Sequence, residues 1–424
     1  MRRTRRWVEL GKDVLIAALA LSAIALFTMT PLVQDSGLLS TTPLPVQAGR
    51  GDSVTLTAAA YPSRMALTSD AGRYGVQYDQ SAVDQLFSQT GALLGEALTS
   101  AGQAEALDEE RWRALLQGEN LYFDFSGQIP LAALGSWLDP QGQQCALEGS
   151  ARRILLAAGE EDTVLLCWQG EEDAFFSCQT GLSRSLHLSP AVTGTEENGA
   201  LFAFENQSLS PLLDPYTLFT ESVSQTVYAA STPVSSGSDL SWLLDALSFN
   251  GQNHTSITGG EAYLEGDDRL EVRSGGTVLF RAGQPGRYPV ARTGAQPTLA
   301  EIVEAARELA EATIGANCGQ ARLHLISARE TQEGWLIQFG YQLDGSSVWL
   351  YEDGWAAQFL VRDGFVTQFT LQFRTYTDTG EQAVLLPADR AAAILPTLTR
   401  QPRELVLQYR DQGESLVEPI WVAQ

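Results

Sequence analysis

The chain has 424 residues and a formal net charge of −24, from 27 Lys and Arg against 51 Asp and Glu. At about 150 residues per domain this length predicts two to three folding units, and the 44% of hydrophobic residues excludes disorder over the whole chain. The first 13 residues carry a net +3, so the remainder carries −27. Because a body this acidic repels phosphates, we expect no nucleic-acid partner.

The first predicted element is a segment of twenty uncharged residues, 14–33. As an α-helix it would span roughly 30 Å, the thickness of the hydrocarbon core of a bilayer. The basic residues of the stub before it, 1–13, place the N-terminus in the cytoplasm by the positive-inside rule. We therefore predict a single-pass transmembrane anchor in the lipid bilayer of the cell membrane, followed by an extracytoplasmic body. A cleaved signal peptide is the alternative, and it also exports the body.

Small side chains form a stripe on the predicted anchor. Ala18, Ser22 and Ala25 follow the spacing i, i+4 and i+7, which places them on one face of a helix. Small residues at this spacing let a second transmembrane helix approach closely. The stripe predicts a contact with a transmembrane partner, although an alanine-rich anchor can also produce it by chance.

The exported part divides into a linker and three segments. Residues 34–52 are rich in Pro, Gly, Ser and Thr without periodicity, which is typical of a linker. In the N-terminal domain, 53–210, a helix is predicted near 81–100 and is followed by several short strands. A middle domain, 211–296, has a helix near 239–247 and then three strands separated by turns rich in Gly and Asp.

The C-terminal domain, 297–424, has the clearest pattern. Thr298 and Glu301 form a capping box at the start of a helix, and a series of alternating strands follows. Pro387 opens a second helix, Ala388–Leu395. The fold class is therefore α+β, with a single N-terminal transmembrane helix and a multi-domain body of antiparallel sheets packed with helices.

Motifs of known chemistry are missing from the sequence. The three histidines, His187, His254 and His324, are far apart and form no HxxxH or HxH pattern, and there is no GxSxG, HExxH or Walker loop. We therefore predict no enzymatic activity, no cofactor and no metal site. A pair of carboxylates that meets in space, as in glycosidases, is the alternative.

Three acidic runs have simple structural interpretations. The run at 108–110 is predicted to begin a helix, where acidic side chains favour the helix dipole. The runs at 160–162 and 171–173 are predicted as solvated hairpin turns.

The cysteines allow free thiols or a disulfide. A hairpin with Trp168 opposite Asp173 would place Cys167 and Cys178 roughly 13 Å apart along the strands. A disulfide needs Cα atoms within about 7 Å, so this pairing is disfavoured. Cys145 is a better partner for either, and buried free thiols are the other outcome.

Several phrases of the sequence resemble a known family. Leu247-Ser248-Phe249-Asn250 precedes three short strand-like phrases, at 262–265, 269–272 and 276–280. This order is similar to the "LSFN" segment and the following run of the YycH/YycI regulators of Gram-positive bacteria. The phrase at 339–345, with Val366 and the 385–395 helix, is similar to the terminal domain of that family.

The resemblance covers the whole architecture and is closer to YycH, because of the length and the additional N-terminal unit. It implies an extracytoplasmic regulator of a sensor histidine kinase of the WalK (YycG) type, which controls cell-wall metabolism in a two-component system. It also implies protein–protein contacts inside and outside the membrane and a companion YycI-like protein. The family has no catalytic residues to carry over. The alternatives are an exported cell-wall ligand-binding module and a wall-polymer hydrolase.

Overall fold

The structure is a computed structural model that describes most of the chain after residue 56. The described residues are 57–139, 144–207, 209, 211–220, 225–235, 238–290, 296–399 and 401–424. They belong to one compact unit, Val54–Gln424. The predicted stub, anchor and linker lie outside the described residues. Among the residues that are described, no helix has the length and apolar character needed to cross a membrane.

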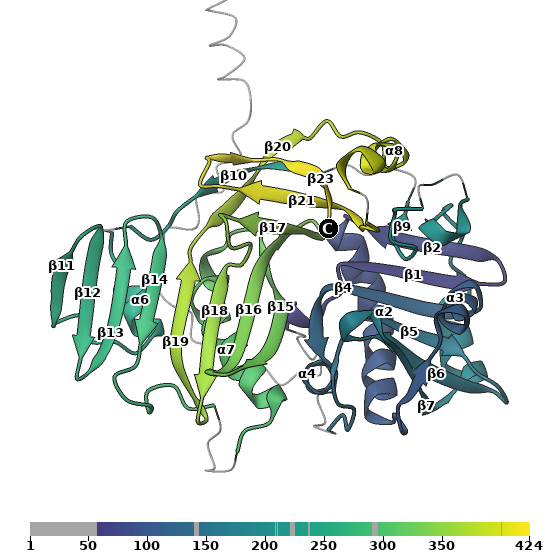
Figure 1. Cartoon of the computed structure of the whole chain (residues 1–424), viewed down its shortest axis with the longest axis horizontal. Helices are drawn as coiled ribbons and strands as arrows, with labels where there is room; N and C mark the ends of the chain where they lie inside the picture. The colour runs from purple at the N-terminus through teal and green to yellow at the C-terminus, as the bar shows by residue number, and fades with distance from the viewer. Residues whose placement is uncertain are drawn as a thin grey trace, which may run out of the picture. The chain divides into compact units, whose positions relative to one another are not determined.

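The N-terminal part of the body forms an antiparallel sheet of seven strands in the order β2-β1-β4-β5-β6-β7-β3 (Figure 1). Its strands are β1 Arg64–Ser69, β2 Gly72–Gln77, β3 Glu105–Leu107, β4 Asn120–Pro130, β5 Ser150–Ala158, β6 Thr163–Gln169 and β7 Phe175–Ser183. Successive residues of the central strands enter different cores: Ile154 packs in one and Leu155 in the other. This alternation means that both faces of the sheet are covered.

Helices provide the cover on each face. Their bounds are α2 Gln80–Thr99, α3 Glu109–Gln117, α4 Leu131–Leu138 and α5 Ser189–Val192. Phe87 of α2 packs in the same core as Ile154, whereas Trp112 of α3 packs with Leu155. The helix predicted near 81–100 is confirmed as α2, and its N-cap Asp79 accepts a hydrogen bond from the backbone N–H of Ala82.

The second large sheet has eleven strands. Its order is β11-β12-β13-β14-β19-β18-β16-β17-β21-β23, and β15 pairs with β16 beside this path. The strands are β11 His254–Ile257, β12 Gly260–Glu265, β13 Asp268–Arg273, β14 Thr277–Arg281, β15 Arg322–Thr331, β16 Gly334–Leu343, β17 Ser346–Leu350, β18 Ala357–Arg362, β19 Phe365–Gln372, β21 Leu405–Asp411 and β23 Pro419–Ala423. Only β17 and β21 pair in parallel among these described strands.

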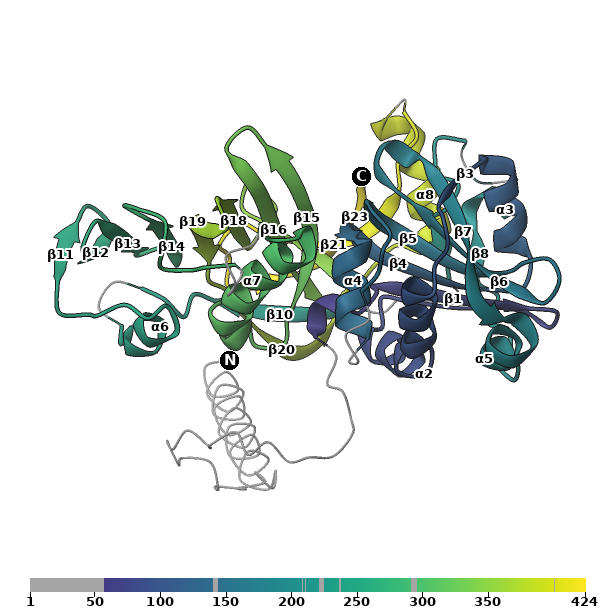
Figure 2. The same ribbon diagram turned by 90° about the horizontal axis from the view of Figure 1, so that it is seen from below.

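Two helices belong to this sheet: α6 Ser241–Ala246 and α7 Leu299–Ala312. The predicted capping box at the start of α7 is confirmed, with Thr298 and Glu301 bonded to each other's backbone N–H. Ile302 and Val303 of α7 are buried in the core. The helix also contacts α4 of the seven-stranded sheet, as Figure 2 shows. The body is therefore a sheet-rich α+β structure, as predicted.

Smaller elements complete the body. A three-stranded sheet has the order β20-β10-β22, and β8 pairs with β9. Their bounds, with that of the last helix, are β8 Leu201–Phe202, β9 Leu218–Phe219, β10 Thr226–Ser231, β20 Thr375–Gln382, β22 Leu416–Val417 and α8 Ala388–Leu398. The helix predicted after Pro387 is confirmed as α8.

The predicted register of the β6–β7 hairpin is wrong. Cys167 pairs with Ser177, and Leu166 pairs with Cys178, because the residues 171–173 form a short 3-10 turn instead of extending β7. Neighbouring residues of a strand point to opposite faces, so the two sulfurs lie on different sides of the sheet. All four cysteines are buried free thiols, and burial raises the pKa of Cys178 to about 11.

Candidate functional site

Charged side chains gather inside the body, where the two large sheets meet. Cross-strand pairing aligns three of them: Arg64 on β1 lies opposite Asp124 on β4, and Asp124 lies opposite Arg153 on β5. Paired residues of antiparallel strands share one face, so the register alone produces a row of alternating charge. Arg152, the neighbour of Arg153, also approaches Asp124, with 3.5 Å between Nε and Oδ1.

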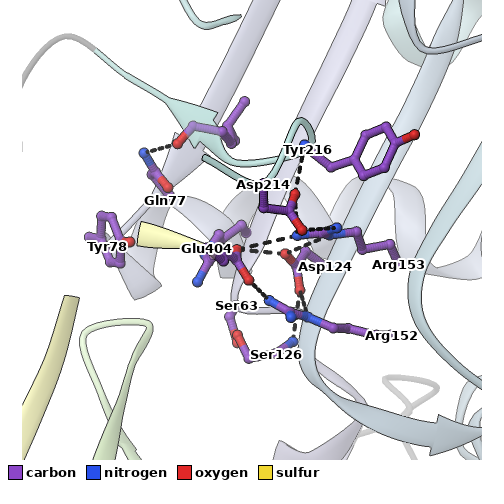
Figure 3. Close-up of polar contacts among 12 residues, drawn as sticks. Ser63, Gln77, Tyr78, Asp124, Ser126, Arg152, Arg153, Asp214, Tyr216 and Glu404 are labelled. Atoms are coloured by element: carbon purple, nitrogen blue, oxygen red, sulfur yellow. Dashed lines mark hydrogen bonds and ion pairs between the residues drawn. The ribbon is translucent and has the colours of Figure 1, made fainter. Parts of the chain in front are cut away.

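Glu404 completes this row from the other sheet, since it lies immediately before β21. Its carboxylate accepts a hydrogen bond from Arg64, at 2.5 Å. It also accepts one from Arg152 and lies 3.4 Å from Arg153 (Figure 3). We call these five residues, Arg64, Asp124, Arg152, Arg153 and Glu404, the buried ion-pair cluster. The cluster joins segments that are 252 residues apart in the chain.

A sixth charge borders the cluster. Asp214 lies 3.4 Å from Arg153, and its carboxylate also accepts a hydrogen bond from the backbone N–H of Tyr216. The ring of Tyr216 is 5.5 Å from the guanidinium carbon of Arg153, a distance at which a cation–π attraction operates. Arg153 therefore lies among three carboxylates, those of Asp124, Asp214 and Glu404, and an aromatic face.

Burial is nearly complete for four residues of the cluster, whereas the side chain of Arg152 is 24% exposed. Glu404 is 4% exposed and Asp124 is 1% exposed. Burial alone would raise the pKa of Glu404, but the charges of Arg152, Arg64 and Arg153 outweigh it and hold the pKa well below its usual range. The same competition, led again by burial and then by Arg152, lowers the pKa of Asp124. Both carboxylates are ionised at neutral pH, so neither can donate a proton as a general acid.

Neutral hydrogen bonds surround the cluster and join the same two sheets. The backbone N–H of Leu407 on β21 donates to the hydroxyl of Tyr78, at 3.1 Å. The amide of Gln342 on β16 donates to the hydroxyl of Ser63, at 2.6 Å. The junction between the two sheets is therefore held by neutral hydrogen bonds as well as by ion pairs.

A cavity of about 480 Å³ opens beside the cluster. Arg64 and Arg152 line it from the seven-stranded sheet, and His324 on β15 lines it from the eleven-stranded sheet. Burial lowers the pKa of His324 to about 4, so its ring is neutral at pH 7. Within the described ranges, no group of three His, Cys, Asp or Glu side chains is placed to hold a metal ion.

The structure places the sequence-predicted residues as follows. Ala18, Ser22 and Ala25 lie outside the described residues, so the transmembrane contact stays a prediction. Asp108 is confirmed as the cap of α3, where it accepts a hydrogen bond from the backbone N–H of Arg111. The acidic runs at 160–162 and 171–173 are exposed turns, as predicted.

The sequence analysis missed the buried ion-pair cluster, although a signal was present. Asp124 stands within a run of apolar strand residues, and Arg64, Arg153 and Glu404 each directly precede one. A charged residue on a buried strand needs a partner of opposite charge, because an unpaired buried charge is costly. That argument predicts that partners exist, but it does not say which residues they are.

Comparison with known proteins gives one structural relative. No family model and no curated protein matches the sequence. Among solved structures, the crystal structure of YycH from Bacillus subtilis matches with a TM-score of 0.56 and 14% sequence identity. The match covers 87% of this chain and 94% of that chain. The chain thus has the fold of YycH, as the resemblance of its sequence predicted.

Proposed function

We propose that this chain is a membrane-anchored extracytoplasmic regulatory protein of a sensor histidine kinase of the WalK type. The observation that carries the proposal is the match to the YycH fold over 87% of this chain and 94% of the relative. Through the kinase, the protein regulates cell-wall metabolism, and a YycI-like protein is its companion. Segment 14–33 anchors it in the cell membrane and leaves the body outside.

The chemistry of the candidate site favours a binding role over a catalytic one. The buried carboxylates, Asp124 and Glu404, are held ionised by guanidinium groups and cannot exchange protons near neutral pH. The ion pairs link segments that are distant in the chain and so hold the two large sheets together in one arrangement. Such a body regulates by presenting contacts to a partner.

The proposed mechanism is a shift of the kinase between its active and inactive states. A regulator that binds one state more tightly than the other moves the equilibrium by the difference in binding free energy. About 1.4 kcal/mol of difference changes the ratio of the two states tenfold. We assign part of this difference to the small stripe of the anchor, Ala18, Ser22 and Ala25.

The test compares two faces of the anchor in the full-length protein. The triple substitution A18L/S22L/A25L fills the small stripe, and the matched control A17L/A20L/A23L adds the same side chains to the opposite face of the predicted helix. Both variants keep the segment apolar. Each is expressed in membranes with a WalK-type kinase, and co-purification and kinase autophosphorylation are measured.

We expect the stripe variant to lose kinase regulation and the control to keep it. If both variants regulate the kinase as well as the wild type does, the stripe is not the contact with the kinase, and that contact lies in the exported body. If the wild-type protein neither co-purifies with the kinase nor changes its autophosphorylation, the regulatory function itself is wrong.

A further inference from the structure

The 480 Å³ cavity beside the buried ion-pair cluster is lined by charged and aromatic side chains. Its lining includes three arginines, Arg64, Arg152 and Arg329, and one acidic side chain, Asp353. Arg64 and Arg152 are paired with Glu404 and Asp124, so their charges are neutralised within the cluster. Arg329 is therefore the guanidinium group of this wall that is left to attract a small anion.

Arg329 is the cation that is free to act on a ligand. It lies on β15 and is exposed, and its guanidinium has neither a hydrogen bond nor an ion pair within the part of the chain that the structure describes. Arg64 and Arg152, by contrast, are already bonded to Glu404. A carboxylate that enters the cavity can pair with Arg329 through two parallel hydrogen bonds.

An aromatic surface lies on the same wall. Trp349 on β17 lines the cavity and is 41% exposed, although large apolar side chains are normally buried. A Cβ atom on Gly354 would lie 3.0 Å from the ring, so the indole rests on a glycine that leaves room for it. An exposed indole face is the usual platform for the apolar face of a sugar ring, and it adds contact area that water does not compete for.

We infer that this cavity binds a small saccharide that carries a carboxylate. Its size falls within the range of about 300–1,000 Å³ that is typical of small-molecule sites. Arg329 pairs with the carboxylate, and Trp349 stacks against the ring. This binding goes beyond the proposed regulatory function and holds or fails independently of it.

The test is calorimetric titration of the purified full-length protein with three related sugars. N-acetylmuramic acid carries a carboxylate, N-acetylglucosamine is its neutral counterpart, and N-acetylglucosamine 6-phosphate supplies a different anion. A charge-assisted hydrogen bond contributes about 1.5–3 kcal/mol, so we expect the acid to bind at least about tenfold more tightly than the neutral sugar. Stronger binding of the phosphate would overturn the assignment of a carboxylate, and no saturable binding of the acid at millimolar concentrations would overturn the site.

Variants locate the binding in the cavity. Arg329→Gln should weaken the acid at least about tenfold and Arg329→Lys less, because the lysine keeps the charge but loses the paired geometry. The matched control is Arg281→Gln, an exposed arginine on β14 that also has no side-chain partner among the described residues. Trp349→Ala should weaken both sugars, and Trp349→Phe should restore part of the loss. Unchanged binding in Arg329→Gln, or an equal loss in the Arg281 control, would contradict the inference.

Discussion

Glu404 is the residue on which the electrostatics of the interior depend. It accepts hydrogen bonds from two guanidinium groups and lies close to a third, while being 4% exposed. The substitution Glu404→Gln leaves Arg64, Arg152 and Arg153 with Asp124 alone inside the cluster. Loss of one partner of a buried ion pair typically costs about 3–5 kcal/mol, so we expect a destabilisation of that size. Urea unfolding of the purified full-length protein measures it.

The control for this prediction is the same substitution at Glu418. That residue is exposed and has no side-chain hydrogen bond or ion pair among the described residues, so Glu418→Gln should change the free energy of unfolding by less than about 0.5 kcal/mol. Similar effects at both positions would mean that the cluster does not stabilise the body.

His324 predicts a pH dependence with a definite sign. Burial lowers its pKa from the usual 6.5 to about 4. A hydrogen bond with the backbone of Gly340 raises the pKa, but by less than burial lowers it. Between these two pH values His324 is protonated in the unfolded chain and neutral in the folded chain, so the free energy of unfolding falls as the pH falls. From pH 7.5 to pH 5 the loss due to this residue is about 2 kcal/mol. Chemical unfolding across this range should give a flatter profile for His324→Gln, and the exposed His254→Gln should follow the wild type.

At the scale of elements, the two large sheets meet along β4 and β15. A Cβ atom on Gly127 of β4 would lie 2.2 Å from the carbonyl oxygen of Leu325 on β15. The backbone cannot yield as a flexible side chain can, so Gly127→Ala must push the strands apart. Overpacking of this kind typically costs about 1–3 kcal/mol, measured by thermal or urea unfolding. Gly118→Ala is the control, because its nearest atom is 3.7 Å away, and it should be nearly neutral.

Local signals were sufficient for some elements and not for others. The capping box at Thr298 and the acidic start at 108–110 predicted two helices, because caps act within one turn. The predicted β6–β7 register was wrong. The 3-10 turn at 171–173 shifts which residues pair, and the pattern of apolar and polar residues in the two strands does not reveal this shift. The pairing of β10 with β20 was not predicted either. Tertiary packing decides which strands pair, and the residue pattern of a single strand does not identify its partner.

The same limit applies to the candidate site. The buried charges were visible within or directly before apolar runs, yet Glu404 lies 340 residues from Arg64. Only the folded chain brings them together. The cavity residues Arg329 and Trp349 carried no sequence signal, because the sequence does not say whether the side chain of a strand residue is exposed or lines a cavity.

For the whole molecule, net charge predicts a response to salt. The residues after the first 13 carry −27, so the folded body repels itself. Raising the ionic strength from 0.01 to 0.1 M shortens the Debye length from about 30 to about 10 Å and screens this repulsion. We expect the Tm of the full-length protein to rise with NaCl and equally with KCl, as measured by differential scanning calorimetry. A fall in Tm would mean that surface ion pairs outweigh the net charge.

The distance along the chain between Arg152 and Glu404 also has a consequence in time. The two residues are 252 positions apart, and a ribosome adds about 5–20 residues per second, so roughly 13 to 50 s separate their synthesis. During that interval Arg64, Arg152 and Arg153 have Asp124 as the carboxylate of the cluster and lack Glu404. The ion pairs of this sheet with Glu404 therefore form only after residue 404 has been made. The proposed export of the body would profit from such a delay, since a secretion channel threads unfolded polypeptide.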